Sequence, residues 1–204
     1  MAKKKKKKLP LHHLAIAGVS YALLFWGAAS DITGTDSDNK CGGDELWEQK
    51  VLIDDSAVRI RKTPQVTTIV DLININTEDE QRTKEHPRLS FEYQEVTVKN
   101  VLIRKVIRED DNDYHLVIQD RAGNHMIAEI ADPKCDDAKR SQFIDQFSDV
   151  RQKMDDYGET FLQYEFNITG VLFRDRSHGQ TGKSDNNLEI HPVLKLRKVK
   201  KIKI

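Results

Sequence analysis

The segment DYHLVIQDRAGNHMIAEI, residues 113–130, constrains the fold more than any other part of this chain. Its apolar side chains recur at every second position in both halves: Tyr114, Leu116 and Ile118, then Met126, Ala128 and Ile130. This two-residue period is typical of strands with one buried face. Arg121–Asn124 supplies a turn, in which Gly123 can adopt positive φ. We therefore predict a β-hairpin, and because a lone hairpin is marginal in water, further strands must cover it.

The flanking sequence predicts those strands. Phe91–Arg108 alternates as one long bent strand, and Tyr164–Asp175 and Leu188–Leu196 alternate again after the hairpin. Ser141–Met154 has apolar residues at helical spacing, with Ser141 as a plausible N-cap. The order strand, strand, strand, helix, strand, strand predicts a mainly β fold with α, a five-stranded Greek-key barrel of the OB type. The alternative is an open α+β sheet with the same order.

The N-terminus has the pattern of an export signal. Lys3–Lys8 precedes an apolar run, Leu14–Ala29, which ends in small residues. We predict a signal peptide or signal anchor over residues 1–30, with the N-terminus in the cytoplasm if it is retained in the membrane. The protein would then be periplasmic or extracellular. A buried core helix with a lysine tail is the alternative.

The other predicted divisions follow composition. Residues 31–43 form a polar spacer, 44–88 an N-terminal flap with short helices around Asp55–Arg61 and after Pro64, 89–196 the OB-like domain, and 197–204 a basic tail. The two cysteines, Cys41 and Cys135, would close a long loop in an oxidising compartment, so we predict a disulfide. Two independent thiols are the alternative.

The formal net charge of +0 conceals an uneven distribution. Residues 1–29 contain six lysines and no acid. The rest of the chain therefore has 27 basic and 33 acidic residues, a net charge of −6. This acidity argues against a general nucleic-acid-binding surface, which needs clustered Lys and Arg. It does not exclude a local basic groove.

The loop and strand after residue 177 contain the most specific polar signal outside the hairpin. Two glycines flank Gln180 and Thr181 and suggest a backbone shape that side chains would obstruct. Glu189 and His191 share one strand face, and His115 could lie near them. The predicted ligand-binding residues are therefore His115, His178, Gly179, Gln180, Thr181, Gly182, Glu189 and His191.

These residues admit three interpretations. His115, Glu189 and His191 could bind a metal ion, although strand spacing alone fixes no coordination geometry. His178 could act as an acid or base with Asp120 or Glu189. In the third interpretation the polar groups only tie loops to strand ends. No nucleotide loop or nucleophile elbow occurs in the sequence, and we predict neither cofactor nor metal.

Three segments carry a resemblance to a known family. CGGDELWEQKVLIDDSAVRI, DNDYHLVIQDRAGNHMIAEIADPKC and NITGVLFRDRSHGQTGKSDNNLEIHPVLKL resemble the patterns CGxERWxVKTxxD, DSDYHLVLxDxxGxTMIAEIPxPxC and VTGVGFFDxxHGQTGxAPNxIELHPVL. These patterns belong to a family of uncharacterised, mostly bacterial exported proteins. The resemblance implies an OB-like fold, and a nucleic-acid-binding label sometimes given to the family rests on fold analogy. This chain departs from the aromatic GFFD at Leu172–Asp175 and from Ala-Pro at Lys183–Asp185, which weakens any aromatic stacking platform there.

Our first functional hypothesis is an exported, monomeric OB-like module that binds a ligand of unknown class. Single-stranded nucleic acid is one candidate, because Tyr114, Phe166 and Phe173 could stack bases. The second is a secreted hydrolase or nuclease that uses His178 with an acidic partner. The third is a structural envelope protein whose basic C-terminal tail, Lys195–Ile204, holds anionic lipid or a partner. The predicted partners are an unknown ligand and, if the N-terminal segment is uncleaved, the membrane.

Overall fold

The computed structural model describes residues 41–42, 46–176 and 179–202, and it is mainly β with few helices. The six strands are β1 (Arg61–Thr67), β2 (Gln94–Arg108), β3 (Tyr114–Gln119), β4 (His125–Ile130), β5 (Tyr164–Arg174) and β6 (Leu188–Lys201). The predicted signal or anchor segment, 1–30, lies outside the described residues, as does most of the predicted spacer.

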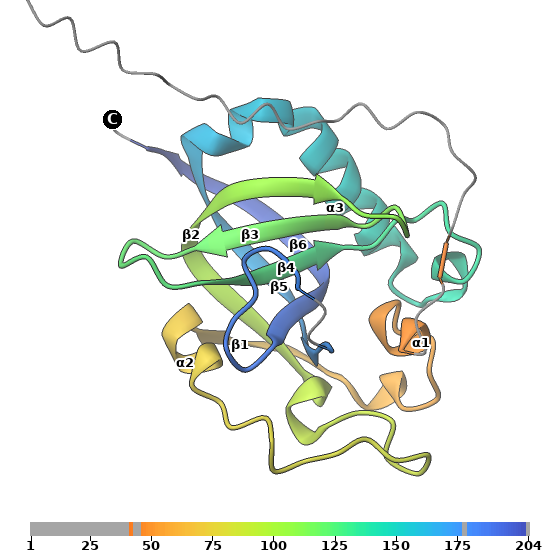
Figure 1. The fold of residues 1–204 in the computed structure, drawn as a ribbon. Coiled ribbons are helices and arrows are strands. Elements are labelled where there is room, and N and C mark those ends of the chain that lie inside the picture. The colour runs from red at the N-terminus through yellow and green to blue at the C-terminus, as the bar shows by residue number, and fades with distance from the viewer. Residues whose placement is uncertain (1–40, 43–45, 177–178, 203–204) are drawn as a thin grey trace, which may run out of the picture.

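The sheet closes on itself. Its order is β1-β2-β3-β4-β6-β5, and β2 also pairs with β5, so five strands form a closed mixed barrel with β1 added in parallel along β2 (Figure 1). β4 pairs with β6 in parallel, whereas the other barrel pairs are antiparallel. This closure excludes the open sheet and is consistent with the predicted OB-like barrel.

The long strand β2 makes the closure possible. Its first half pairs with β5 and its second half with β3, and the register with β5 shifts between Val98 and Val101. Asn100 within this bulge has φ 56°, and its amide donates to Asn167 Oδ1 at 3.1 Å. A bulge bends its strand and increases the local twist, which lets one strand serve both sides of the barrel.

The predicted hairpin forms, with β3 and β4 paired in antiparallel. Leu116 pairs with Ala128 and Ile118 with Met126, and all four side chains are fully buried in the barrel core. Gly123 has φ 97° in the turn. The two-residue apolar period therefore predicted correctly which face of each strand is buried.

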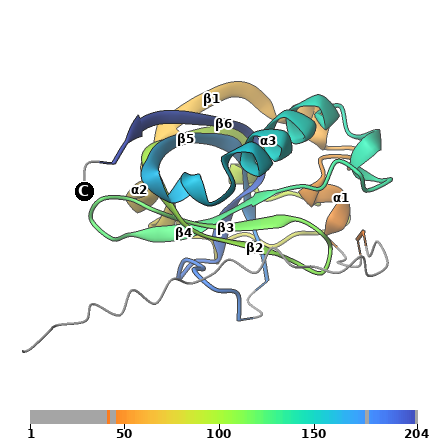
Figure 2. The same cartoon turned by 90° about the horizontal axis from the view of Figure 1, so that it is seen from above.

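Helix α3 (Ile144–Tyr157) lies along the barrel and packs on β6 and β4 (Figure 2). Val150 and Met154 reach the barrel core, while Phe147 joins a second apolar cluster. The helix begins later than predicted, because Phe143 occupies the N-cap position and the Ser141 hydroxyl instead accepts from the Phe143 amide. Ser141 as N-cap is therefore wrong. The other helical turns are η2 (Ser90–Tyr93), η3 (Ala138–Arg140) and η4 (Gly158–Gln163).

The chain before β2 packs beside the barrel. It contains α1 (Trp47–Lys50), η1 (Ala57–Arg59), β1 and α2 (Ile69–Ile73). The helical turn η1 lies within the first predicted helix, and α2 is the helix predicted after Pro64. The strand β1 lies between them. Trp47 and Leu52 from this region belong to the same buried apolar cluster as Cys135. The predicted disulfide between Cys41 and Cys135 is confirmed, with Cα atoms 5.4 Å apart.

Two further findings concern the ends of the chain. The predicted basic tail continues strand β6 as far as Lys201, which pairs with Tyr164. Across the portion of the chain that the structure describes, no helix has the length and apolar character needed to span a membrane.

Candidate functional site: a buried histidine–carboxylate cluster and a basic groove

Three strands bring the two predicted strand histidines together. The hairpin register places His115 of β3 opposite Glu129 of β4, and β6 runs beside β4 with Ile127 opposite Glu189. His191 follows two residues later on β6. The side chains of His115, Glu129, Glu189 and His191 are all almost fully buried. The proximity of His115, Glu189 and His191 that the sequence suggested is therefore present, and Glu129 is the residue that joins them.

The contacts of this cluster are short. His115 Nδ1 lies 3.1 Å from Glu129 Oε1 and 3.1 Å from Glu109 Oε1. His191 Nδ1 lies 3.1 Å from Glu189 Oε1 and 2.8 Å from Glu129 Oε2, and its Nε2 lies 3.5 Å from Asp113 Oδ2. Glu129 thus contacts both histidines with its two oxygens.

Burial and the neighbouring charges raise the pKa of some groups in this cluster and lower that of another. Burial opposes the imidazolium of His115, but Glu109 and Glu129 outweigh it and raise the pKa of His115 to about 10. Burial also opposes ionisation of Glu129, yet the positive charge of His191 and the hydrogen bond from His115 hold the pKa of Glu129 below its usual value. Burial and the charge of Glu129 raise the pKa of Glu189 to about 8.

The loop between β5 and β6 covers this cluster. The Thr181 carbonyl oxygen lies 2.8 Å from His115 Nε2, and Gln180 Nε2 donates to Asp175 Oδ2 at 3.1 Å. At Gly182, φ is 80° and a Cβ atom would lie 2.6 Å from a methyl group of Val117. The predicted backbone shape is confirmed here, because only glycine fits so close to β3.

Other predicted residues lie elsewhere. Gly179 is in the same loop with φ 85°, while His178 falls outside the described residues, so its roles stay predictions. Asp120 occupies the hairpin turn, at the opposite end of β3 from His115. Its carboxylate accepts from the amides of Ala122 and Asn124 and from the Asn124 side chain, which is the bonding of a turn residue.

The proposed aromatic stacking platform is not available. Phe166 and Phe173 are fully buried, and Phe173 packs edge-on against His191 with ring centroids 5.8 Å apart. Tyr114 is half-buried, and the Arg151 guanidinium already stacks on it at 3.4 Å from the ring centroid.

Sequence reasoning missed Glu129 and Asp113, although a signal for Glu129 existed. The predicted turn and the alternation of the hairpin together fix the register, which places Glu129 directly opposite His115. Asp113 offered no such signal, since its approach to His191 depends on how β6 docks against β4. Both residues belong to groups whose geometry could hold a metal ion: Glu109, His115 and Glu129 form one, and Asp113, Glu129 and His191 the other.

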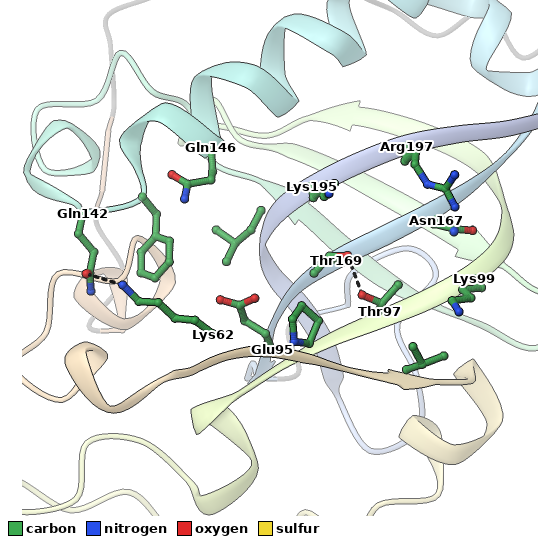
Figure 3. A pocket seen from close by; sticks show the side chains of 14 residues that line it. Lys62, Glu95, Thr97, Lys99, Gln142, Gln146, Asn167, Thr169, Lys195 and Arg197 are labelled. Atoms are coloured by element: carbon green, nitrogen blue, oxygen red, sulfur yellow. Dashed lines mark hydrogen bonds between the residues drawn. The ribbon is translucent and has the colours of Figure 1, made fainter.

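A second feature is an open groove of about 510 Å³ on the outer surface of the barrel (Figure 3). Its floor is formed by polar residues of β2 and β5, where Thr97 and Thr169 share a 2.7 Å hydrogen bond. Strand β1 borders one side of the groove, and strand β6 together with the start of α3 borders the other side. The full lining is Lys62, Pro64, Val66, Glu95, Thr97, Lys99, Gln142, Phe143, Gln146, Asn167, Thr169, Leu194, Lys195 and Arg197.

The groove is basic although the chain beyond residue 29 is acidic. Four exposed cations line it, Lys62, Lys99, Lys195 and Arg197, against the single carboxyl of Glu95. Burial raises the pKa of Glu95 despite the positive charge of Lys62. Among the described acidic residues, none forms an ion pair with Lys99, Lys195 or Arg197. These three cations are therefore available to an anionic ligand.

The fold and these two features define the chain as a disulfide-linked closed mixed β-barrel with a buried polar cluster and a basic groove. No protein-family model, curated protein or solved structure matches this chain. The family membership indicated by the sequence motifs therefore stays a prediction.

Proposed function

We propose that this protein is an exported OB-like module that binds an extended anionic ligand, with single-stranded nucleic acid as the candidate, along the basic groove. The strand order and the position of α3 between β4 and β5 support the OB-like assignment. The disulfide is compatible with an exported protein. The observation that carries the proposal is the charge of the groove. Its lining contains four cations and one carboxyl, that of Glu95; the cations are Lys62, Lys99, Lys195 and Arg197.

The charge pattern of the groove favours a ligand that is contacted through its backbone. Lys99 comes from β2, and Lys195 and Arg197 come from alternate positions of β6, so the cations are spread along the groove and are not gathered at one point (Figure 3). Asn167, Thr97 and Thr169 between them offer hydrogen-bonding groups. Because Phe143 is the only aromatic residue in the lining and is almost fully buried, base stacking contributes little. Binding would therefore depend on salt and little on sequence.

The test is fluorescence anisotropy of a labelled oligothymidylate with the disulfide-bonded protein. Four phosphate contacts predict that log K falls with log salt with a slope of about −3, from about −0.7 per contact. Arg197→Ala should weaken binding and make the slope shallower by about 0.7. Lys105→Ala is the matched control, because Lys105 is an exposed cation of β2 outside the groove.

Two outcomes would overturn the proposal. One is the absence of oligonucleotide binding at about 50 mM salt, where electrostatic binding is strong. The other is an equal loss in Lys105→Ala and Arg197→Ala, which would indicate general attraction rather than a groove. Electrophoresis of the recovered oligonucleotide tests the nuclease hypothesis in the same samples, because a binding module leaves it intact.

A further inference from the structure

Three buried side chains each carry one polar atom without a hydrogen-bond partner, and these atoms lie close together. They are Oδ2 of Asp113, Oε2 of Glu129 and Nε2 of His191. The residues are 0%, 2% and 0% exposed, respectively. Leaving a buried polar or charged group unpaired carries a free-energy cost, so such groups normally have a partner. They lie at ion-pair distance within the cluster, 3.5 Å between His191 Nε2 and Asp113 Oδ2 and 2.8 Å between His191 Nδ1 and Glu129 Oε2, but without hydrogen-bond geometry. At this spacing one bound cation could satisfy all three.

The other polar atom of each side chain is held by the protein. Asp113 Oδ1 accepts from the Asp132 amide at 2.8 Å, and Glu129 Oε1 lies 3.1 Å from His115 Nδ1. His191 Nδ1 shares a 3.1 Å hydrogen bond with Glu189. In metal sites, a ligating histidine commonly donates its second ring N–H to a carboxylate, which fixes the tautomer and directs the other nitrogen to the ion. His191 has this arrangement.

We propose that Asp113, Glu129 and His191 bind a divalent transition-metal ion of the zinc class. Their ligand atoms lie within 4.8 Å of one another. Asp113 Oδ2 and His191 Nε2 are 3.5 Å apart, so an ion about 2.1 Å from each would subtend about 110°, the tetrahedral angle. Glu129 Oε2 lies 2.8 Å from His191 Nδ1 and would turn toward the ion as the third ligand.

The chemistry of the donor set agrees with this class of ion. One imidazole with two carboxylates suits zinc and its neighbours, whereas calcium and magnesium prefer oxygen ligands alone. The ion would replace the proton on Nε2 of His191, which is released on binding. Its two positive charges would also offset the buried carboxylates of Asp113 and Glu129.

The second group that could hold an ion, Glu109, His115 and Glu129, fits less well. His115 Nδ1 already contacts both carboxylates, and its Nε2 faces the carbonyl oxygen of Thr181, so neither ring nitrogen is left without a partner. This group therefore serves to orient Glu129, and substitution of Glu109 distinguishes it from the first group.

The experiment is metal titration of the disulfide-bonded protein after treatment with a chelator and dialysis. Elemental analysis should find one zinc per chain, and cobalt added instead should give the intense visible absorption of a four-coordinate ion. Asp113→Asn should lower the zinc affinity at least 100-fold, and Glu189→Leu, which removes a positioning contact to His191, by about 10–100-fold. Asp149→Asn, at an exposed acid of α3 outside the cluster, should leave the zinc affinity unchanged, and Glu109→Gln should lower it less than Asp113→Asn does.

The outcomes separate the alternatives. A wild-type protein that retains no zinc and gives no cobalt spectrum overturns the proposal without reference to any variant. Loss of zinc in Glu109→Gln but not in Asp113→Asn would place the ion at the other group and also overturns it. If Asp113→Asn loses its native circular dichroism, Glu189→Leu and the rise in the thermal midpoint of the wild type with zinc decide the question.

Discussion

Removal of the disulfide tests both the stability of the fold and the compartment in which the protein can function. The bridge joins cysteines separated by 94 residues. In the loop-entropy model, a closed loop of this length lowers the entropy of the unfolded chain enough to contribute about 4.7 kcal/mol at 25 °C. Domains are typically stable by about 5–15 kcal/mol, so this is a large part of the total. We expect the Cys41→Ala/Cys135→Ala variant to lose about 4–5 kcal/mol of unfolding free energy.

Urea unfolding followed by far-ultraviolet circular dichroism measures this loss. Reduced wild-type protein is the internal control, since it should unfold near the midpoint of the double variant, while a reductant should not affect the variant. A loss below about 1 kcal/mol would refute the loop-entropy reasoning. A loss of the expected size would mean that the protein needs an oxidising compartment to keep its stability, in agreement with the proposed export.

Three further predictions concern the barrel, the groove and the buried cluster. A Cβ atom on Gly170 would lie 2.3 Å from the Pro192 carbonyl oxygen, so Gly170→Ala should lower the unfolding free energy by about 1–3 kcal/mol in the same urea assay. Glu95→Gln removes the only carboxyl of the groove and should tighten oligonucleotide binding about fivefold, corresponding to about 1 kcal/mol; unchanged or weaker binding would contradict the groove proposal. With a chelator present, the thermal midpoint should fall as pH rises from about 6.5 to 8. In this range the folded chain holds more protons than the unfolded one, because the folded pKa is about 10 for His115 and about 8 for Glu189; a midpoint that rises with pH would contradict this assignment.

The local pattern of apolar and polar residues was sufficient to predict most of the barrel strands. Alternation predicted the hairpin and the long strand β2, and the glycine at position 170 predicted a bend, where the register with β6 shifts. Strand β1 was not predicted, because Arg61–Thr67 is mostly exposed and carries no two-residue apolar period. It is a strand because β2 offers it an edge, and that edge is a tertiary feature.

The candidate functional site also has one part that the sequence predicted and one part that it did not. The sequence predicted that His115, Glu189 and His191 could lie together and that glycines shape the loop beside them. It did not predict the basic groove, because Lys62, Lys99, Lys195 and Arg197 are far apart along the chain and come from three strands.

The sequence by itself thus determined which residues face the core and which cysteines pair, because these depend on a two-residue period and on the presence of only two thiols. The tertiary structure alone decided that β2 pairs with both β3 and β5, which closes the barrel. Closure brings β6 beside β4, so that His191 meets Glu129 and Asp113, and it brings the cations of β6 beside Lys99 on the outer surface. The physical reason is that strand pairing joins residues far apart in sequence, and no local period encodes which strands will pair.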